Sequence, residues 1–236
     1  MARRKGPTDP ARARTRVALG PMSKLYFRCG AMNSGKSTAL LQAAYNYEER
    51  GQRVLLAKPL IDTKGDRSIV SRLGVTRKVD FTLTHDDDAH AVFEAERVRV
   101  RAESGADVAC LLIDEAQFLT TAQVDDLLRI ATIEDVPVIA YGIRTDFQTV
   151  AFPGSRRLLE IAHSLEELKT ICRCGRKALF NARKVDGRFV FDGDQVAIEI
   201  GEVVYESLCA ACYLQESEGL LAGDWWPRGG YAVEPD

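Results

Sequence analysis

Residues 30–37, GAMNSGKS, form the segment from which the fold of this chain can be inferred. They match the pattern G-x-x-x-x-G-K-[ST] at every fixed position, between a short apolar run at 25–27 and helix-forming residues at 38–50. In such a loop the backbone N–H groups point at phosphate oxygens at the start of a helix. A chance glycine turn is the alternative, and the strand before and helix after the loop argue against it. The pattern predicts a phosphate-binding loop (P-loop) made of Gly30, Ala31, Met32, Asn33, Ser34, Gly35, Lys36 and Ser37, with Lys36 on the phosphates and Ser37 on Mg²⁺.

Strand and helix patterns alternate after this loop. The sequence predicts strands at 54–57, 108–113 and 137–143, with helices at 90–101 and 122–130 between them. The run at 108–113 is continuously apolar, as expected of a strand buried on both faces of a sheet. Residues 58–78 mix charge and glycine and are expected to form a long functional loop. This alternation predicts an α/β fold with a parallel sheet and right-handed crossovers.

Two acids, Asp114 and Glu115, follow the apolar run at 108–113 directly. The carboxyl end of a strand beside a P-loop is where Mg²⁺ needs a ligand or a water-bridging group. The second acid could remove a proton from an attacking hydroxyl or water. A solvated acidic turn is the alternative, and spacing alone does not decide which acid has which role.

Four of the six cysteines form two close pairs, Cys172 with Cys174 and Cys209 with Cys212. Four thiolates in two short loops suit tetrahedral zinc, and a closed four-sulfur site is structural. A redox pair and incidental buried cysteines are the alternatives. The other two, Cys29 and Cys110, lie in apolar stretches and are expected to be core residues.

The composition excludes some classes of binding partner. The 236 residues are 46% hydrophobic and 28% charged, with 32 Lys and Arg against 34 Asp and Glu. A net charge of -2 gives no global support for non-specific nucleic-acid binding. No apolar run approaches the ~18 residues of a membrane-spanning helix. We therefore expect no nucleic-acid and no membrane partner and, because no secretory leader is recognisable, a cytoplasmic protein.

The sequence predicts four consecutive parts. They are a disordered basic extension (1–21), an ATP-binding α/β domain (22–168), a zinc-binding domain (169–222) and a flexible tail (223–236). The extension carries six Lys or Arg and a single Asp and cannot bury apolar surface.

Five segments, taken in order, resemble one family. They read GAMNSGKST (30–38), LLIDEAQFL (111–119), YGIRTDFQTVAF (141–152), ICRCGRKA (171–178) and YESLCAACY (205–213). Together they resemble the thymidine kinases of the P-loop-plus-zinc type, from about residue 22 to residue 213. The resemblance implies a RecA-like P-loop core, a small zinc-binding domain that carries a lasso loop, and transfer of the ATP γ-phosphate to the 5′-hydroxyl of thymidine. It also implies a homotetramer and feedback inhibition by thymidine triphosphate (dTTP).

The resemblance further implies individual roles. Glu115 corresponds to the catalytic base and Asp114 to the acid on the Mg²⁺ side, and four cysteines, Cys172, Cys174, Cys209 and Cys212, would hold zinc. The residues that would bind the nucleoside are Met32 at the 5-methyl group, Phe118 on the thymine ring, Ile143 and Phe147 in the pocket, Tyr205 closing over the base, Asp62 on the sugar side, and Asn181, where a threonine often binds the base. Because one methyl group is worth only about 1–3 kcal/mol, deoxyuridine should be a weaker substrate.

Two positions depart from the family pattern. Ile200 precedes Gly201 where the lasso commonly has a Gly-Gly pair, and Lys64 stands where an arginine is usual.

Two other functions compete with a nucleoside kinase. One is a P-loop ATPase with a zinc ribbon that acts on DNA, which would need a basic groove. The other is a catalytically silent regulatory nucleotide binder.

Overall fold

The computed structural model of the chain describes residues 22–60, 67–193 and 203–222. Several expectations lie outside these residues: the basic extension, the tail, the sugar-side Asp62, and the departures at Lys64 and at Ile200 with Gly201.

The main part of the molecule is a parallel sheet with the strand order β5-β2-β6-β7-β1-β8. The strands are β1 (Leu25–Cys29), β2 (Arg53–Pro59), β5 (Phe81–Leu83), β6 (Val108–Ile113), β7 (Val138–Gly142) and β8 (Ser164–Glu167). Strand β7 lies between β1, which leads into the P-loop, and β6, which leads into the acidic pair. This order confirms the predicted α/β fold and its RecA-like core.

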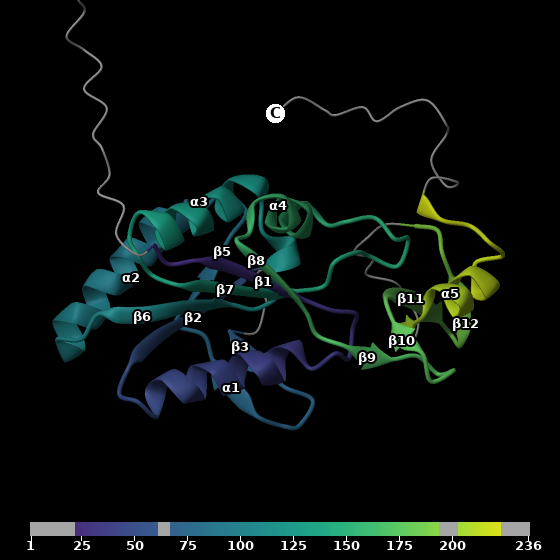
Figure 1. The fold of residues 1–236 in the computed structure, drawn as a ribbon, viewed down its shortest axis with the longest axis horizontal. Coiled ribbons are helices and arrows are strands. Elements are labelled where there is room, and N and C mark those ends of the chain that lie inside the picture. Colours follow the sequence, from purple (N-terminus) through teal and green to yellow (C-terminus); the bar gives the residue numbers. More distant parts are fainter. Residues whose placement is uncertain (1–21, 61–66, 194–202, 223–236) are drawn as a thin grey trace, which may run out of the picture.

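Helices cover both faces of the sheet, with α1 on one face and α2, α3 and α4 on the other (Figure 1). They span α1 (Lys36–Glu48), α2 (Ala89–Ser104), α3 (Thr121–Thr132) and α4 (Pro153–Ile161), and a short 3₁₀ turn η1 (Ala116–Phe118) follows β6. Alternate residues of β2 enter opposite cores: Leu56 packs in the cluster with Leu40 of α1, and Leu55 in the cluster with Phe93 of α2. This alternation explains why the central strands are apolar throughout.

The prediction of a long loop at 58–78 is wrong in part. Strand β2 continues to Pro59, and an antiparallel hairpin, β3 (Ser68–Val70) paired with β4 (Thr76–Lys78), follows. Ile69 of this hairpin is buried in the α1 cluster, which anchors it to the core. Strands of three residues are too short for periodicity to reveal, and the same reason hides β5. Helix α4 and strand β8 were also absent from the sequence prediction.

Beyond β8 the chain forms a smaller unit of short strands around a helix, at the green and yellow end of Figure 1. Strands β9 (Thr170–Ile171) and β10 (Lys177–Ala178) form a hairpin, and β11 (Phe180–Val185) pairs with both β12 (Arg188–Val190) and β13 (Val203–Leu208). Helix α5 (Ala210–Glu216) packs Tyr213 against Phe180 and Phe191. Within the described ranges, no helix is long and apolar enough to cross a membrane.

Candidate functional site

The P-loop joins β1 to α1. Gly35, immediately before the helix, has φ 78°, a left-handed conformation that glycine adopts without steric cost. Lys36 begins the helix, and its Nζ donates to the carbonyl oxygens of Ala31 (2.9 Å) and Gly30 (3.2 Å). Burial lowers the pKa of Lys36, while the nearby carboxylates of Glu115 and Asp114 act in the opposite direction. The ammonium is therefore held inside the loop, close to both acids.

Ser37, in the first turn of α1, is hydrogen-bonded to Asp114, which follows β6. The Ser37 hydroxyl donates to Asp114 Oδ2 at 3.2 Å, and the carboxylate is almost completely buried. Burial, reinforced by the charge of Glu115, raises the pKa of Asp114 to about 6. A hydroxyl and a carboxylate are the hard oxygen ligands that Mg²⁺ prefers, so this donor pair fits the ion that accompanies ATP.

Glu115 faces a different environment from its neighbour. Its backbone is left-handed (φ 52°, ψ 36°), a conformation that is uncommon for a residue with a side chain and that recurs at functional sites. The carboxylate Oε2 accepts a hydrogen bond from Gln117 Nε2 at 2.6 Å, whereas Asp114 Oδ1 accepts from the Glu115 backbone N–H at 3.0 Å. Two consecutive acids thus acquire separate partners. No role was predicted for Gln117, although it lies in the D-E-x-Q-F motif (114–118), because only the fold shows what its amide contacts.

The smaller unit reaches the P-loop at Met32. The Met32 backbone N–H donates to Asn181 Oδ1 at 2.7 Å, and its carbonyl oxygen accepts from the Ser207 hydroxyl. Asn181 and Ser207 are paired residues of β11 and β13 and therefore lie on the same face of that sheet. The Asn181 amide also donates to the Thr145 carbonyl at 3.2 Å. These bonds bring two expected nucleoside residues, Met32 and Asn181, together with a serine that the sequence did not single out.

The other expected pocket residues lie on three segments: the one that follows β7, strand β13 and the turn η1. Ile143 follows β7, and Phe147 is buried with its ring centroid 3.8 Å from the guanidinium carbon of Arg183. The Tyr213 hydroxyl donates to the Phe147 carbonyl at 2.6 Å, which ties this segment to α5. Tyr205 lies in β13 opposite Arg183, on the same face as Asn181 and Ser207. Phe118 packs edge-on against Phe152, with ring centroids 5.4 Å apart.

The four paired cysteines come together at the junction of the β9–β10 hairpin with α5. The Sγ atoms of Cys172, Cys174, Cys209 and Cys212 all lie within 4.8 Å of one another, with Cys174 and Cys209 at 3.6 Å. Tetrahedral zinc with Zn–S bonds of about 2.3 Å requires sulfur–sulfur separations of about 3.8 Å. The thiols share hydrogen bonds: the Cys212 backbone N–H lowers the pKa of Cys209, and bonds with Cys174 and Cys172 raise that of Cys212. This donor set fits structural zinc.

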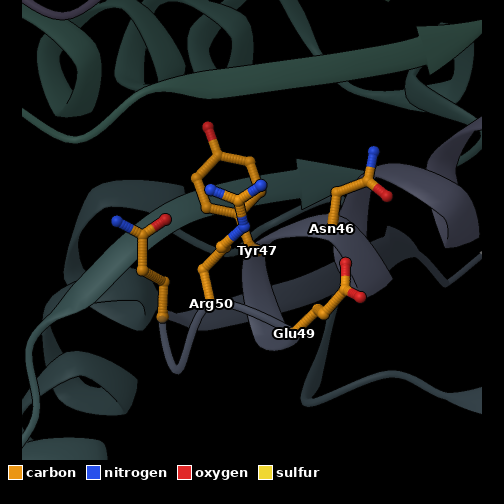
Figure 2. Close-up of a pocket in the computed structure, with 5 residues that line it drawn as sticks. Asn46, Tyr47, Glu49 and Arg50 are labelled. Carbon is orange, nitrogen blue, oxygen red and sulfur yellow. The ribbon is translucent and has the colours of Figure 1, made fainter.

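A hollow on the surface has no part in this site. It is lined by residues around the end of α1, among them Asn46, Tyr47, Glu49 and Arg50 (Figure 2). The P-loop lies at the other end of α1, a distance of about 20 Å along a 13-residue helix.

Comparison with known proteins gives a consistent result. Residues 23–213 match the family model described as thymidine kinase. The thymidine kinase of Enterobacteria phage T4 is 47% identical over 190 residues, which cover 80% of this chain and 94% of the phage protein. That of Legionella pneumophila (strain Paris) is 44% identical over 209 residues, covering 88% of this chain and 95% of the relative. That of Idiomarina loihiensis is 48% identical over 201 residues, covering 84% and 100%. Because the match includes the P-loop, the acidic pair and all four clustered cysteines, the chain belongs to the thymidine kinase family.

Proposed function

We propose that this protein transfers the γ-phosphoryl group of ATP to the 5′-hydroxyl of thymidine, giving thymidine monophosphate and ADP in pyrimidine salvage. The observation that carries the proposal is the junction at Met32, where the P-loop is hydrogen-bonded to the sheet of the cysteine-bearing unit. A phosphoryl donor on the loop and a nucleoside beside Met32 would then be neighbours. Membership of the thymidine kinase family supports the choice of substrate.

On the phosphate side, the loop N–H groups and Lys36 bind the ATP phosphates. Ser37 and Asp114 would hold the Mg²⁺ that accompanies ATP, which would supply positive charge to offset the charge that develops on the phosphates. Glu115 accepts the proton of the 5′-hydroxyl as that oxygen attacks phosphorus. The separate partners of the two carboxylates support this division, since Asp114 is bonded to Ser37 and Glu115 is not.

On the nucleoside side, the thymine is enclosed by Met32, Phe118, Ile143, Phe147, Tyr205 and Asn181, with Asp62 on the sugar. Enclosure excludes water, which would otherwise compete with the hydroxyl for the phosphoryl group. An apolar pocket gains only about 1–3 kcal/mol from the 5-methyl group, so deoxyuridine is a weaker substrate.

The cysteine cluster, Cys172, Cys174, Cys209 and Cys212, holds one structural zinc that fixes the smaller unit and takes no part in the chemistry. The proposed location is the cytoplasm, where a reducing environment keeps such thiols available to zinc. A homotetramer that dTTP inhibits completes the proposal, as the resemblance described under Sequence analysis implies. The protein's partners are then ATP and thymidine, with no nucleic acid or membrane among them.

The test is thymidine-dependent release of ADP by the purified protein, compared with the Glu115→Gln variant. Loss of a general base should lower kcat about 10²- to 10⁴-fold while ATP binding is retained. Glu103→Gln, on the exposed surface of α2, is the matched control and should turn over normally. ATP hydrolysis that is stimulated by single-stranded DNA and indifferent to thymidine would instead favour a DNA-acting ATPase. Unchanged turnover in Glu115→Gln would remove the base assignment.

A further inference from the structure

Gln117 is a buried amide between the carboxyl ends of β6 and β7, and its side chain is bonded at both ends. It is 1% exposed, its Nε2 donates to Glu115 Oε2 at 2.6 Å, and its Oε1 accepts from the Ile143 backbone N–H at 3.2 Å. The amide therefore connects the proposed base to the strand end that carries a proposed wall of the nucleoside pocket.

The two partners fix which way this amide points. A backbone N–H can only donate, so the atom of the Gln117 amide that faces Ile143 must be the oxygen. The NH₂ group is then directed at Glu115, whose Oε2 must accept. A side chain that keeps only an acceptor could bond the Ile143 N–H but could not donate to Glu115 Oε2.

The surrounding backbone leaves the amide little freedom to move. A Cβ atom added at Gly142 would lie 2.7 Å from Gln117 Oε1 and 3.1 Å from its backbone nitrogen. On the other side, a Cβ at Gly154 would lie 2.4 Å from the Ala116 carbonyl oxygen. The contacts at 2.7 Å and 2.4 Å are closer than a Cβ atom tolerates. The turn that carries Glu115 and Gln117 is thus seated tightly between β7 and α4.

We propose that Gln117 is a positioning residue for phosphoryl transfer: it fixes the Glu115 carboxylate relative to the end of β7, so that this base meets the 5′-hydroxyl of the bound nucleoside. The inference rests on the proposed function, because it assigns Gln117 a role through Glu115. Gln117 occupies one accepting position of Oε2 and leaves the rest of the carboxylate for the hydroxyl proton. A base held in this way avoids the loss of rate that follows from a small misplacement.

Two variants separate the hydrogen bonds. Gln117→Leu removes both of them, whereas Gln117→Glu keeps the shape and the acceptor for Ile143 but places a second carboxyl group against Glu115, where the pair shares a proton and Glu115 is a poorer base. We expect each to lower kcat about 10- to 100-fold, below the full contribution of a general base, with the KM values for thymidine and ATP changed less than about threefold. Gln123→Leu is the matched control, because Gln123 is equally buried and bonds only to backbone groups and to its own helix cap. It should lose thermal stability and keep its kcat.

A double-mutant cycle with Glu115→Gln gives the decisive readout. If Gln117 acts through Glu115, adding Gln117→Leu to Glu115→Gln should lower kcat no further. Additive losses, or a wild-type kcat in both Gln117 variants, would overturn the proposal. Failure of the proposed function would look different, because the unmodified protein itself would then show no thymidine-dependent ADP release.

Discussion

At the scale of single residues, Asp114 and Glu115 show how one backbone conformation separates two chemistries. Asp114 directly follows the buried strand β6, is bonded to Ser37, and has a pKa that burial raises to about 6. Glu115 adopts φ 52°, so its carboxylate reaches Gln117. Residues that alternate along a regular strand would have pointed to opposite faces of the sheet. The left-handed turn instead leaves both acids at the edge next to the P-loop.

The raised pKa predicts that Asp114→Asn stabilises the nucleotide-free protein at alkaline pH. Because the folded pKa is above the ordinary value of 3.8, the contribution of Asp114 to stability is fully present below pH 3.8 and is lost as the pH rises through about 6. At pH 8 the buried charge should cost about 1–3 kcal/mol, which Asn avoids. Thermal melts without Mg²⁺ and ATP should show a higher Tm for the variant at pH 8 and a smaller difference at pH 5, while turnover is lost. Asp86→Asn, whose side chain is 99% exposed, should shift neither melt. A variant that melts lower than wild type at both pH values would contradict this account.

At the scale of elements, the β11–β13 pair fastens the P-loop. Asn181 and Ser207 are register partners, and they bond the N–H and the carbonyl of the same residue, Met32. Because register partners share a face, one strand pairing presents both groups to the loop together. The conformation of the P-loop is thereby linked to the smaller unit, which carries the clustered cysteines.

We expect Ser207→Ala to weaken ATP binding about three- to tenfold, as loss of one net hydrogen bond of about 1 kcal/mol implies. Zinc content should stay at the wild-type value, since no cysteine is touched. The matched control is Ser217→Ala in the same unit, because Ser217 is also buried and donates to a carbonyl, that of Leu220, instead of to the P-loop. Titration with ATP by calorimetry makes the measurement. Equal affinities for Ser207→Ala and wild type would show that the bond does not constrain the loop.

At the scale of the whole molecule, the two units differ in what stabilises them. The parallel sheet buries a continuous core on each face, whereas the smaller unit buries few side chains around Tyr213. A unit of about 50 residues rarely supplies enough hydrophobic stabilisation alone and is commonly held by metal or disulfides. The four clustered cysteines of this unit fit a zinc ion that would supply that constraint.

Removal of zinc should therefore loosen the smaller unit before the sheet. Elemental analysis should find about one zinc per chain, and Cys209→Ser should lower that content and speed proteolysis after residue 168. Thymidine-dependent turnover should fall as the zinc content falls, because Met32 is bonded to residues of β11 and β13. Cys110→Ala, at a cysteine buried in the sheet core, should keep its zinc. Metal-free protein with full activity would contradict this dependence.

Much of the fold was predictable from sequence patterns that extend over a few residues. The P-loop, the strand at 108–113 and the helices at 90–101 and 122–130 were predictable because glycine spacing, apolar runs and helical periodicity act over a few residues. The four cysteines were predictable as a cluster because their spacing in sequence is typical of a metal site. The short strands β5 and β8 and the β3–β4 hairpin gave no such signal, since three or four residues do not establish a period.

The sequence by itself determined the α/β class, the phosphate loop and the four cysteines that the fold gathers into a cluster. Only the tertiary structure decided that β7 separates the P-loop strand from the acidic strand, that Gln117 bridges Glu115 and Ile143, and that Met32 is bonded to Asn181 and Ser207. The last two bonds join residues 149 and 175 positions apart. Contacts at such separations arise from the packing of whole elements, which patterns within a few residues do not encode.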